Sequence, residues 1–336
     1  MFKYLILISI LLVTFSCNSK KSKQEVAYIY NQGQAQGTYY AATYLQPEGR
    51  DLQQQLDSFF KAFDNSLSTY NDSSIISRIN RNEAVEVDEH FIRMFHAAQK
   101  ISAETNGAFD ITVAPMVNAW GFGFKNNINP TKELIDEMLQ YVGFQKVNLI
   151  GKTLVKDDPR IMLDASAIAQ GLSADYIAKL FEKNGCENYM IDIGGEIVCK
   201  GKNPKGEDWK IGIDKPIDDP TNSNSELQTI IKITNKAITT SGNYRKFYIK
   251  DGKKYAHTIN PKTGYPVEHN LLSATVIADN CTDADAYSTA FMVIGKDSAY
   301  ALCKRHKELE CYLIYTDHTG AYQVIYTPGF KKYLMD

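Results

Sequence analysis

The sequence lacks several features that mark common classes of protein. It has no apolar run long enough for a membrane span, because residues 4–15 fall short of the roughly 20 residues that a span requires. It has no surplus of positive charge, with 37 Lys and Arg against 39 Asp and Glu, so its charge does not favour nucleic-acid binding. It also has no Cys-x-x-Cys pair and no Cys/His cluster at zinc spacing. These absences leave a near-neutral globular protein with no expected nucleic-acid partner.

The first residues have the pattern of a bacterial export signal. Lys3 precedes the short apolar run, and Ser16 precedes Cys17, which is the order of a lipoprotein signal and its cleavage site. We expect residues 1–16 to be a signal peptide, Cys17 to carry lipid and residues 17–25 to be a flexible tether. The lipid would anchor the protein on the periplasmic side of a membrane, which we expect to be the inner membrane. A plain signal peptide and a short anchor are the alternatives.

The remaining residues, 26–336, form one domain or two closely packed lobes, because no interior linker is rich in Pro, Gly or Ser. Apolar spacing predicts helices, and alternating runs predict strands that pair mostly by hairpins in the second half. The expected class is α+β, with mixed, largely antiparallel sheets covered by helices. We predict helices at 52–68, 91–105, 131–139, 165–183 and 283–293, and strands at 37–45, 188–193, 196–200, 209–214, 229–234, 244–249, 273–278, 311–316 and 322–326.

Cysteines are few, and without Cys17 their number is odd. We expect them to be mostly buried, where they act as small hydrophobic residues. A disulfide between the last two is compatible with an oxidising compartment, but the sequence does not decide it. The five are Cys186, Cys199, Cys281, Cys303 and Cys311.

Two segments place oxygen-bearing side chains among small residues, at 164–171 and 281–290. Within the second, Asp285 and Thr289 are four residues apart, so on a helix their oxygens share one face. Such ligands suit a hard cation such as Mg²⁺, and small neighbours let a phosphate approach the backbone. An Asp and a Thr at this spacing are more often a helix cap and its neighbour. The pair alone leaves both interpretations open.

Other candidate binding residues follow predicted helices or strands. Tyr70 follows the first helix, and Phe109 and Asp110 follow the second, where they project from turns. His257 lies at a strand end beside a proline-containing turn, a setting suited to proton transfer or phosphate contact. Each of these also has a plain interpretation as a turn or core residue.

Two turns complete this set. Gly194-Gly195 joins two strands and predicts a tight hairpin turn that explains both glycines. Residues 239–244 are rich in hydroxyl groups and predict a turn, after which Arg245 is a candidate phosphate contact.

Taken together and in this order, the segments resemble the ApbE-type flavin transferase family, the FAD:protein FMN transferases. No single segment is decisive, but nine in the family's order are specific, and they extend over residues 36–294. The resemblance implies an ApbE-like, T-fold-like form of the α+β class. Members are often periplasmic lipoproteins, which agrees with the independent interpretation of Cys17. The segments are Gln36–Tyr40, Ser68–Tyr70, Gly107–Val113, Trp120–Gly123, Asp164–Gly171, Gly194–Glu196, Thr240–Tyr244, His257–Gly264 and Ala284–Ala290.

The resemblance implies Mg²⁺-dependent transfer of FMN from FAD to a Thr or Ser hydroxyl of a partner protein, with release of AMP. The implied acceptor is a protein of a membrane redox complex. By similarity, the Mg²⁺ ligands are the carbonyl of Ala167 and the side chains of Asp285 and Thr289. His257 and Asp283 are the candidates for proton transfer, and the sequence does not choose between them. The implied FAD contacts are Gln36, Tyr70, Ala108, Phe109, Asp110, Asp164, Gln170, His257, Thr258 and Ile259.

Two positions depart from the family pattern. Gln36 stands where the family usually has Met, which replaces an apolar flavin contact with a polar one. Gln170 stands where Lys or Glu is common, so its contact with FAD is expected to be weaker or rearranged. Neither position belongs to the implied metal site.

Two other functions are compatible with the same residues. An FAD pyrophosphatase would use water in place of the protein hydroxyl and yield free FMN and AMP. A non-catalytic flavin-binding lipoprotein would not need the metal ligands, so the presence of Asp285 and Thr289 argues against it. The chain contains no convincing acceptor motif of its own, so we do not expect it to flavinylate itself.

Overall fold

The structure is a computed structural model that describes residues 27–123, 130–218, 226–250 and 252–335. The predicted signal peptide, Cys17 and the tether lie outside these ranges. Within them, no helix combines the length and the apolar character that crossing a membrane would need. All five cysteines after Cys17 are buried with free thiols, which confirms their expected role as core residues.

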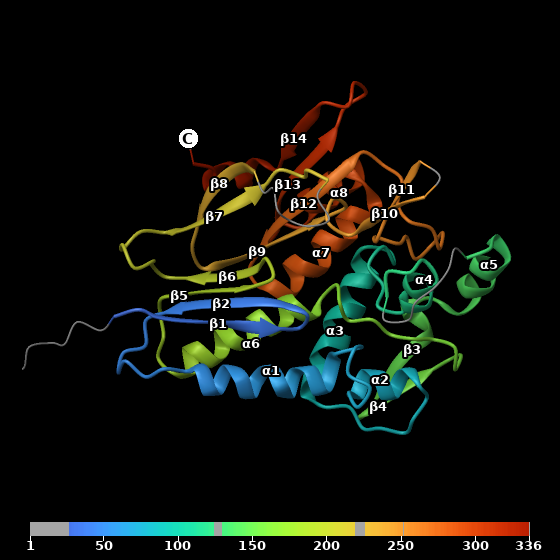
Figure 1. The fold of residues 1–336 in the computed structure, drawn as a ribbon, viewed down its shortest axis with the longest axis horizontal. Coiled ribbons are helices and arrows are strands. Elements are labelled where there is room, and N and C mark those ends of the chain that lie inside the picture. The colour runs from blue at the N-terminus through green and yellow to red at the C-terminus, as the bar shows by residue number, and fades with distance from the viewer. Residues whose placement is uncertain (1–26, 124–129, 219–225, 251, 336) are drawn as a thin grey trace, which may run out of the picture.

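An eight-stranded sheet forms the centre of the molecule (Figure 1). Its order is β1-β2-β5-β6-β9-β12-β13-β14, and each neighbouring pair is antiparallel. This topology confirms the predicted α+β class with a largely antiparallel sheet. The strands are β1 (Ile29–Ala35), β2 (Thr38–Tyr44), β5 (Tyr189–Ile193), β6 (Glu196–Lys200), β9 (Lys236–Gly242), β12 (Leu271–Ala278), β13 (Glu310–Thr316) and β14 (Tyr322–Tyr326).

The two faces of this sheet are covered by different layers, because successive strand residues point to opposite faces. Ala237 and Val276 face the clusters formed with the helices. Ile238 and Ile277 face a third cluster on the other side. That side is covered by the hairpin of β7 (Trp209–Asp214) and β8 (Leu227–Ile233) and by the short helix η2 (Pro328–Tyr333).

The helix α7 (Cys281–Ile294) lies between the sheet and the outer helices and packs on β9, β12, α6 (Ala169–Lys183) and α3 (Glu89–Glu104). The carboxylate of Asp175 on α6 accepts hydrogen bonds from the N–H groups of Cys281 and Thr282, at 2.8 and 2.9 Å. Because the first N–H groups of a helix have no intrahelical partner, these bonds fix where α7 begins relative to α6. The position of α7 in turn fixes its inward-facing side chains.

The remaining elements surround this centre. The elements not yet given are α2 (Ile75–Asn80), α4 (Ala114–Ala119), α5 (Lys132–Tyr141), η1 (Phe144–Lys146), β3 (Val147–Ile150), β4 (Thr153–Lys156) and α8 (Lys296–Arg305). Figure 1 shows α1 (Gln53–Leu67) beside α6, and α2 beside the β3–β4 hairpin. The hairpin of β10 (Phe247–Lys250) and β11 (Lys253–Ala256) projects near α7.

One predicted turn is wrong. Residues 239–242 belong to β9, a central strand of the sheet, and only the residues after Gly242 turn. The hydroxyl groups in this segment suggested a turn, but Thr239 is buried and its strand pairs with β12 and β6. Pairing on both sides and burial override the local preference of hydroxyl residues for turns.

Candidate active site

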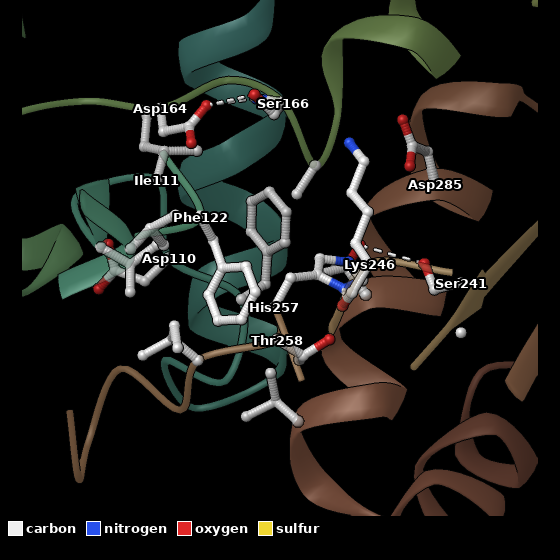
Figure 2. Close-up of a pocket in the computed structure, with 18 of the residues that line it drawn as sticks. Asp110, Ile111, Phe122, Asp164, Ser166, Ser241, Lys246, His257, Thr258 and Asp285 are labelled. Atoms are coloured by element: carbon white, nitrogen blue, oxygen red, sulfur yellow. Dashed lines mark hydrogen bonds between the residues drawn. The ribbon is translucent and has the colours of Figure 1, made fainter. Parts of the chain in front are cut away.

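A cavity of about 320 Å³ opens between α7, the start of α6 and the β10–β11 hairpin. Such a volume suits a small-molecule site. Segments that are far apart in the sequence supply its walls, and Figure 2 shows several of their side chains directed into it. The predicted site residues that line the cavity are Tyr70, Ala108, Phe109, Asp110, Asp164, Ala167, Gln170, His257, Thr258, Ile259, Asp285 and Thr289.

Asp285 provides a buried carboxylate on the α7 wall, with 5% of its surface exposed. Burial raises the pKa of this carboxyl to about 7, and the nearby charge of Asp175 acts in the same direction. The N–H of Gly171 opposes this shift by donating to Oδ2 of Asp285 at 3.0 Å. A carboxylate held in this way would be stabilised by a cation in the cavity.

Neutral oxygen atoms lie on the same wall. Oγ1 of Thr289 is 3.3 Å from Oγ of Ser241, which is 2.8 Å from Oγ of Ser288. The carbonyl of Ala167 precedes α6, and no described backbone N–H donates to it. The N–H of Gly171, which would be its helical partner, points instead to Asp285. The carbonyl is thus available to a ligand.

Glu196 adds a second carboxylate that we did not single out from the sequence. It lies where β6 begins, directly after the turn formed by Gly194 and Gly195, as the pairing of Ile193 with Glu196 confirms. Its Oε2 is shielded from solvent and has no hydrogen-bond partner in the described part of the chain. Burial, and then the charge of Asp285, raise the pKa of Glu196 well above its usual range.

This set of donors fits a hard divalent cation. Two carboxylates, a hydroxyl and a free carbonyl are the oxygen ligands that Mg²⁺ accepts. Across the described ranges, no three His, Cys, Asp or Glu side chains gather as a metal site. The orphaned Oε2 of Glu196 is the observation that favours a cation most directly, because an unpaired buried carboxylate is costly.

The opposite part of the cavity is lined by aromatic and turn residues. Tyr70 is 76% exposed at the rim, and partial desolvation of its hydroxyl, followed by the charge of Asp164, raises its pKa. An exposed ring at the edge of a cavity can stack on a flat ligand. Asp164 accepts from the N–H of Ser166 at 2.8 Å, which shapes the loop before α6 (Figure 2).

Asp110 lines the same part of the cavity, but its carboxylate is engaged within the protein. It accepts from the N–H and hydroxyl of Thr112 and from the N–H of Phe144, at 2.8, 2.6 and 2.7 Å. Burial nevertheless raises the pKa of Asp110. Its contact with FAD stays a prediction, while these bonds give Asp110 a structural role that the sequence did not reveal.

His257 lies opposite Lys246 at the open end of the β10–β11 hairpin. The backbone N–H of His257 donates to the Lys246 carbonyl at 3.1 Å, and Nδ1 lies 3.0 Å from the same oxygen. Because a carbonyl only accepts, Nδ1 carries the proton and Nε2 is left with a lone pair. Burial lowers the pKa of His257 to about 4, so the ring is neutral near pH 7.

Two predicted site residues do not line the cavity. Asp283 forms a 3.3 Å ion pair with Lys100 of α3, because two residues along a helix rotate a side chain away from the face of Asp285. Gln36 lies in the β1–β2 turn with a positive φ of 52°, and both polar atoms of its amide are buried without a described partner. Of the two candidates for proton transfer, only His257 is at the cavity.

Several lining residues were missed, and their sequence signals explain why. Glu196 was missed because the hairpin turn explained the glycines before it. Ser241 was missed because its segment was interpreted as a turn. Lys246 is a single residue without a pattern of its own. Glu196, Ser241 and Phe122 fall within matching segments of the family, which is the signal that points to them.

Comparisons with known proteins agree with this geometry. The model of the ApbE family matches residues 36–313. A protein from Escherichia coli strain K12 named FAD:protein FMN transferase is 34% identical over 316 residues, covering 90% of this chain and 88% of its own. A protein of the same name from Haemophilus influenzae is 34% identical over 338 residues, 96% of each chain.

Solved structures give the same result. The flavin transferase ApbE from Vibrio cholerae has a TM-score of 0.81 at 32% identity, covering 91% of this chain and 99% of that one. The ApbE protein from Thermotoga maritima has a TM-score of 0.79 at 27% identity and covers 92% of this chain. The family model and the relatives both extend over nearly the whole fold and its cavity. The chain therefore belongs to the ApbE family.

Proposed function

We propose that this protein is a transferase that moves FMN from FAD to a partner protein. The observation that carries the proposal is the cavity itself, which gathers the predicted cation ligands and, except for Gln36, the predicted FAD contacts in a member of the ApbE family. Relatives aligned along most of their length are named FAD:protein FMN transferases, which supports the same activity here. The acceptor group is a Thr or Ser hydroxyl, and AMP is the other product.

The cation of this reaction would be Mg²⁺, and Asp285, Thr289, the carbonyl of Ala167 and Glu196 would hold it. When bound, it would supply positive charge that offsets the charge of the pyrophosphate. The protein holds these ligands in place through the N–H of Gly171 and the packing of α7 on the sheet. Tyr70 and the residues around Phe109 bind the flavin part of FAD at the other end of the cavity.

His257 takes the proton of the acceptor hydroxyl. Its carbonyl-bound Nδ1 fixes the tautomer in which Nε2 accepts, and its lowered pKa keeps the imidazole neutral near pH 7, so the lone pair of Nε2 is free for the proton. The hydroxyl oxygen forms a bond to the phosphorus of FMN, and the bond between that phosphorus and the AMP oxygen breaks. The leaving AMP keeps the electron pair of the broken bond.

One assay tests this function. The purified protein is incubated with FAD and Mg²⁺, with and without an acceptor domain carrying a short motif with Asp and Thr. A matched acceptor, in which Ala replaces that Thr, serves as the control. FMN covalently attached to the first acceptor and absent from the second is the expected result. Free FMN in every reaction would support a pyrophosphatase, and intact FAD would support a flavin carrier.

The proposed location is the periplasmic side of a membrane, with Cys17 lipidated and the acceptor in a membrane redox complex. The support is the order of Lys3, the apolar run and Ser16-Cys17. Replacing Cys17 with Ser should move the protein from the membrane fraction to a soluble fraction while its activity on FAD stays intact. Wild-type protein found without lipid in the cytoplasm would rule out this location.

A further inference from the structure

The described cavity lining contains two strongly basic side chains, and only one of them is paired. Nη2 of Arg245 forms a 2.6 Å ion pair with Oδ2 of Asp214. The ammonium of Lys246 has no carboxylate partner among the described residues, although Asp164, Glu196 and Asp285 line the same cavity. Lys246 is therefore the cation with free donors among the described residues that line this site.

The backbone of Lys246 is fixed while its side chain is free to reach a ligand. Its carbonyl accepts from the N–H of His257 at 3.1 Å and lies 3.0 Å from Nδ1 of that ring. In Figure 2 the side chain extends across the cavity, and its nitrogen is drawn between the segment of Ser166 and the helix of Asp285. The positive charge of Lys246 also contributes to lowering the pKa of His257, consistent with their proximity.

An anion in the cavity would complete this arrangement. The acidic wall of Asp285 and Glu196 suits a cation, and Lys246 supplies positive charge from the hairpin on the other side. A phosphate can be held between a cation at that wall and the ammonium of Lys246, and lysine commonly binds phosphate as a compact point charge. The base and sugar portions of a nucleotide carry no negative charge that an ammonium would neutralise.

We propose that Nζ of Lys246 donates a hydrogen bond to a phosphate oxygen of FAD, which makes it a positioning residue for the transfer reaction. The inference rests on the proposed function. As the bond between the FMN phosphorus and the AMP oxygen breaks, the electron pair stays with AMP. Lys246 stabilises the negative charge through this hydrogen bond and transfers no proton, so the step requires no additional proton donor.

Equilibrium binding of FAD and of riboflavin distinguishes this role from that of a solvated surface lysine. Riboflavin carries the same ring but no phosphate. The variants are Lys246→Met, which removes the charge, and Lys246→Arg, which keeps it. Lys250→Met is the matched control, because Lys250 ends β10, the strand that Lys246 directly precedes, and does not line the cavity. Binding is measured with EDTA and again with Mg²⁺ in the absence of an acceptor.

Lys246→Met should weaken FAD binding by about 10- to 100-fold, the usual range for losing a hydrogen bond to a charged group. Riboflavin binding should be unchanged, which also shows that the variant is folded. Lys246→Arg should retain most of the FAD affinity, and Lys250→Met should behave as wild type. The loss in Lys246→Met should shrink at high salt, because salt screens exposed charges.

Three results would overturn the inference. Equal FAD affinity in Lys246→Met and wild type would show that the ammonium does not contact phosphate. Equal losses for FAD and riboflavin would show that the lysine supports the fold of the hairpin. Wild-type protein that binds neither FAD nor riboflavin under either condition would remove the proposed function, and this inference with it.

Discussion

The N–H of Gly171 donates a hydrogen bond to Oδ2 of Asp285 at 3.0 Å and thereby joins the start of α6 to the inward face of α7. A Cβ atom at Gly171 would lie 2.4 Å from the carbonyl oxygen of Cys281 and 2.8 Å from Cβ of Asp285. Only glycine allows the two helices this close, since real Cβ atoms do not approach other atoms at such distances. The orientation of Asp285 therefore depends on a residue in the other candidate segment.

Replacing Tyr70 with Ala tests the flavin end of the cavity. The exposed ring at the rim is placed to stack on the flavin, so its loss should weaken FAD binding by roughly 1 kcal/mol or somewhat more. Tyr70→Phe keeps the ring and should bind FAD nearly as well as wild type. Both affinities can be measured by quenching of flavin fluorescence. Wild-type affinity in Tyr70→Ala would place the flavin on another surface.

Replacing Glu196 with Gln tests the second carboxylate. Because Oε2 of Glu196 has no partner in the described chain, the substitution removes charge without breaking a described hydrogen bond at that atom. The affinity for Mg²⁺, measured by calorimetry, should fall roughly 10- to 100-fold, the range seen when supporting groups of metal sites are lost. Glu187→Gln makes the same change at an exposed residue and serves as the control. Equal Mg²⁺ affinity in both variants would exclude Glu196 from the site.

The lowered pKa of His257 predicts a contribution to stability that depends on pH. The unfolded residue binds a proton below about pH 6.5, whereas the folded residue remains neutral until about pH 4. Between these values the unfolded state holds the extra proton, so the free energy of unfolding decreases as the pH falls. His257→Asn should lack this part of the decrease in urea denaturation. A constant difference between wild type and variant from pH 4 to 8 would contradict the neutral, buried ring.

Periodicity predicted most of the elements that position the site. The helix predicted at 283–293 is α7 at Cys281–Ile294, which ends at Gly295. The helix predicted at 131–139 is α5, which Thr131 caps, since its side chain accepts from the N–H of Leu134. The first strand, β1, was missed because its Gly- and Gln-rich sequence has little strand preference, and pairing with β2 stabilises it instead.

The site itself was predictable in part. The four-residue spacing of Asp285 and Thr289 places both at the cavity, because a helix brings such residues to one face. The same rule argues against Asp283, which is two residues from Asp285 and pairs with Lys100. Glu196 could not be found from the local sequence pattern, because β6 comes to lie next to α7 only in the folded protein.

The most direct test of the account is FMN transfer by Asp285→Asn across a Mg²⁺ titration. Asn keeps the shape of the side chain but removes the negative charge of Asp285 that would bind the cation. Transfer to the acceptor should be lost at low Mg²⁺, and Mg²⁺ affinity should fall, while the circular dichroism spectrum remains that of wild type. Thr289→Val should show a milder loss of the same kind. Near-normal, chelator-sensitive transfer by Asp285→Asn at low Mg²⁺ would contradict the assignment and leave Asp285 as a structural residue that only joins α7 to α6.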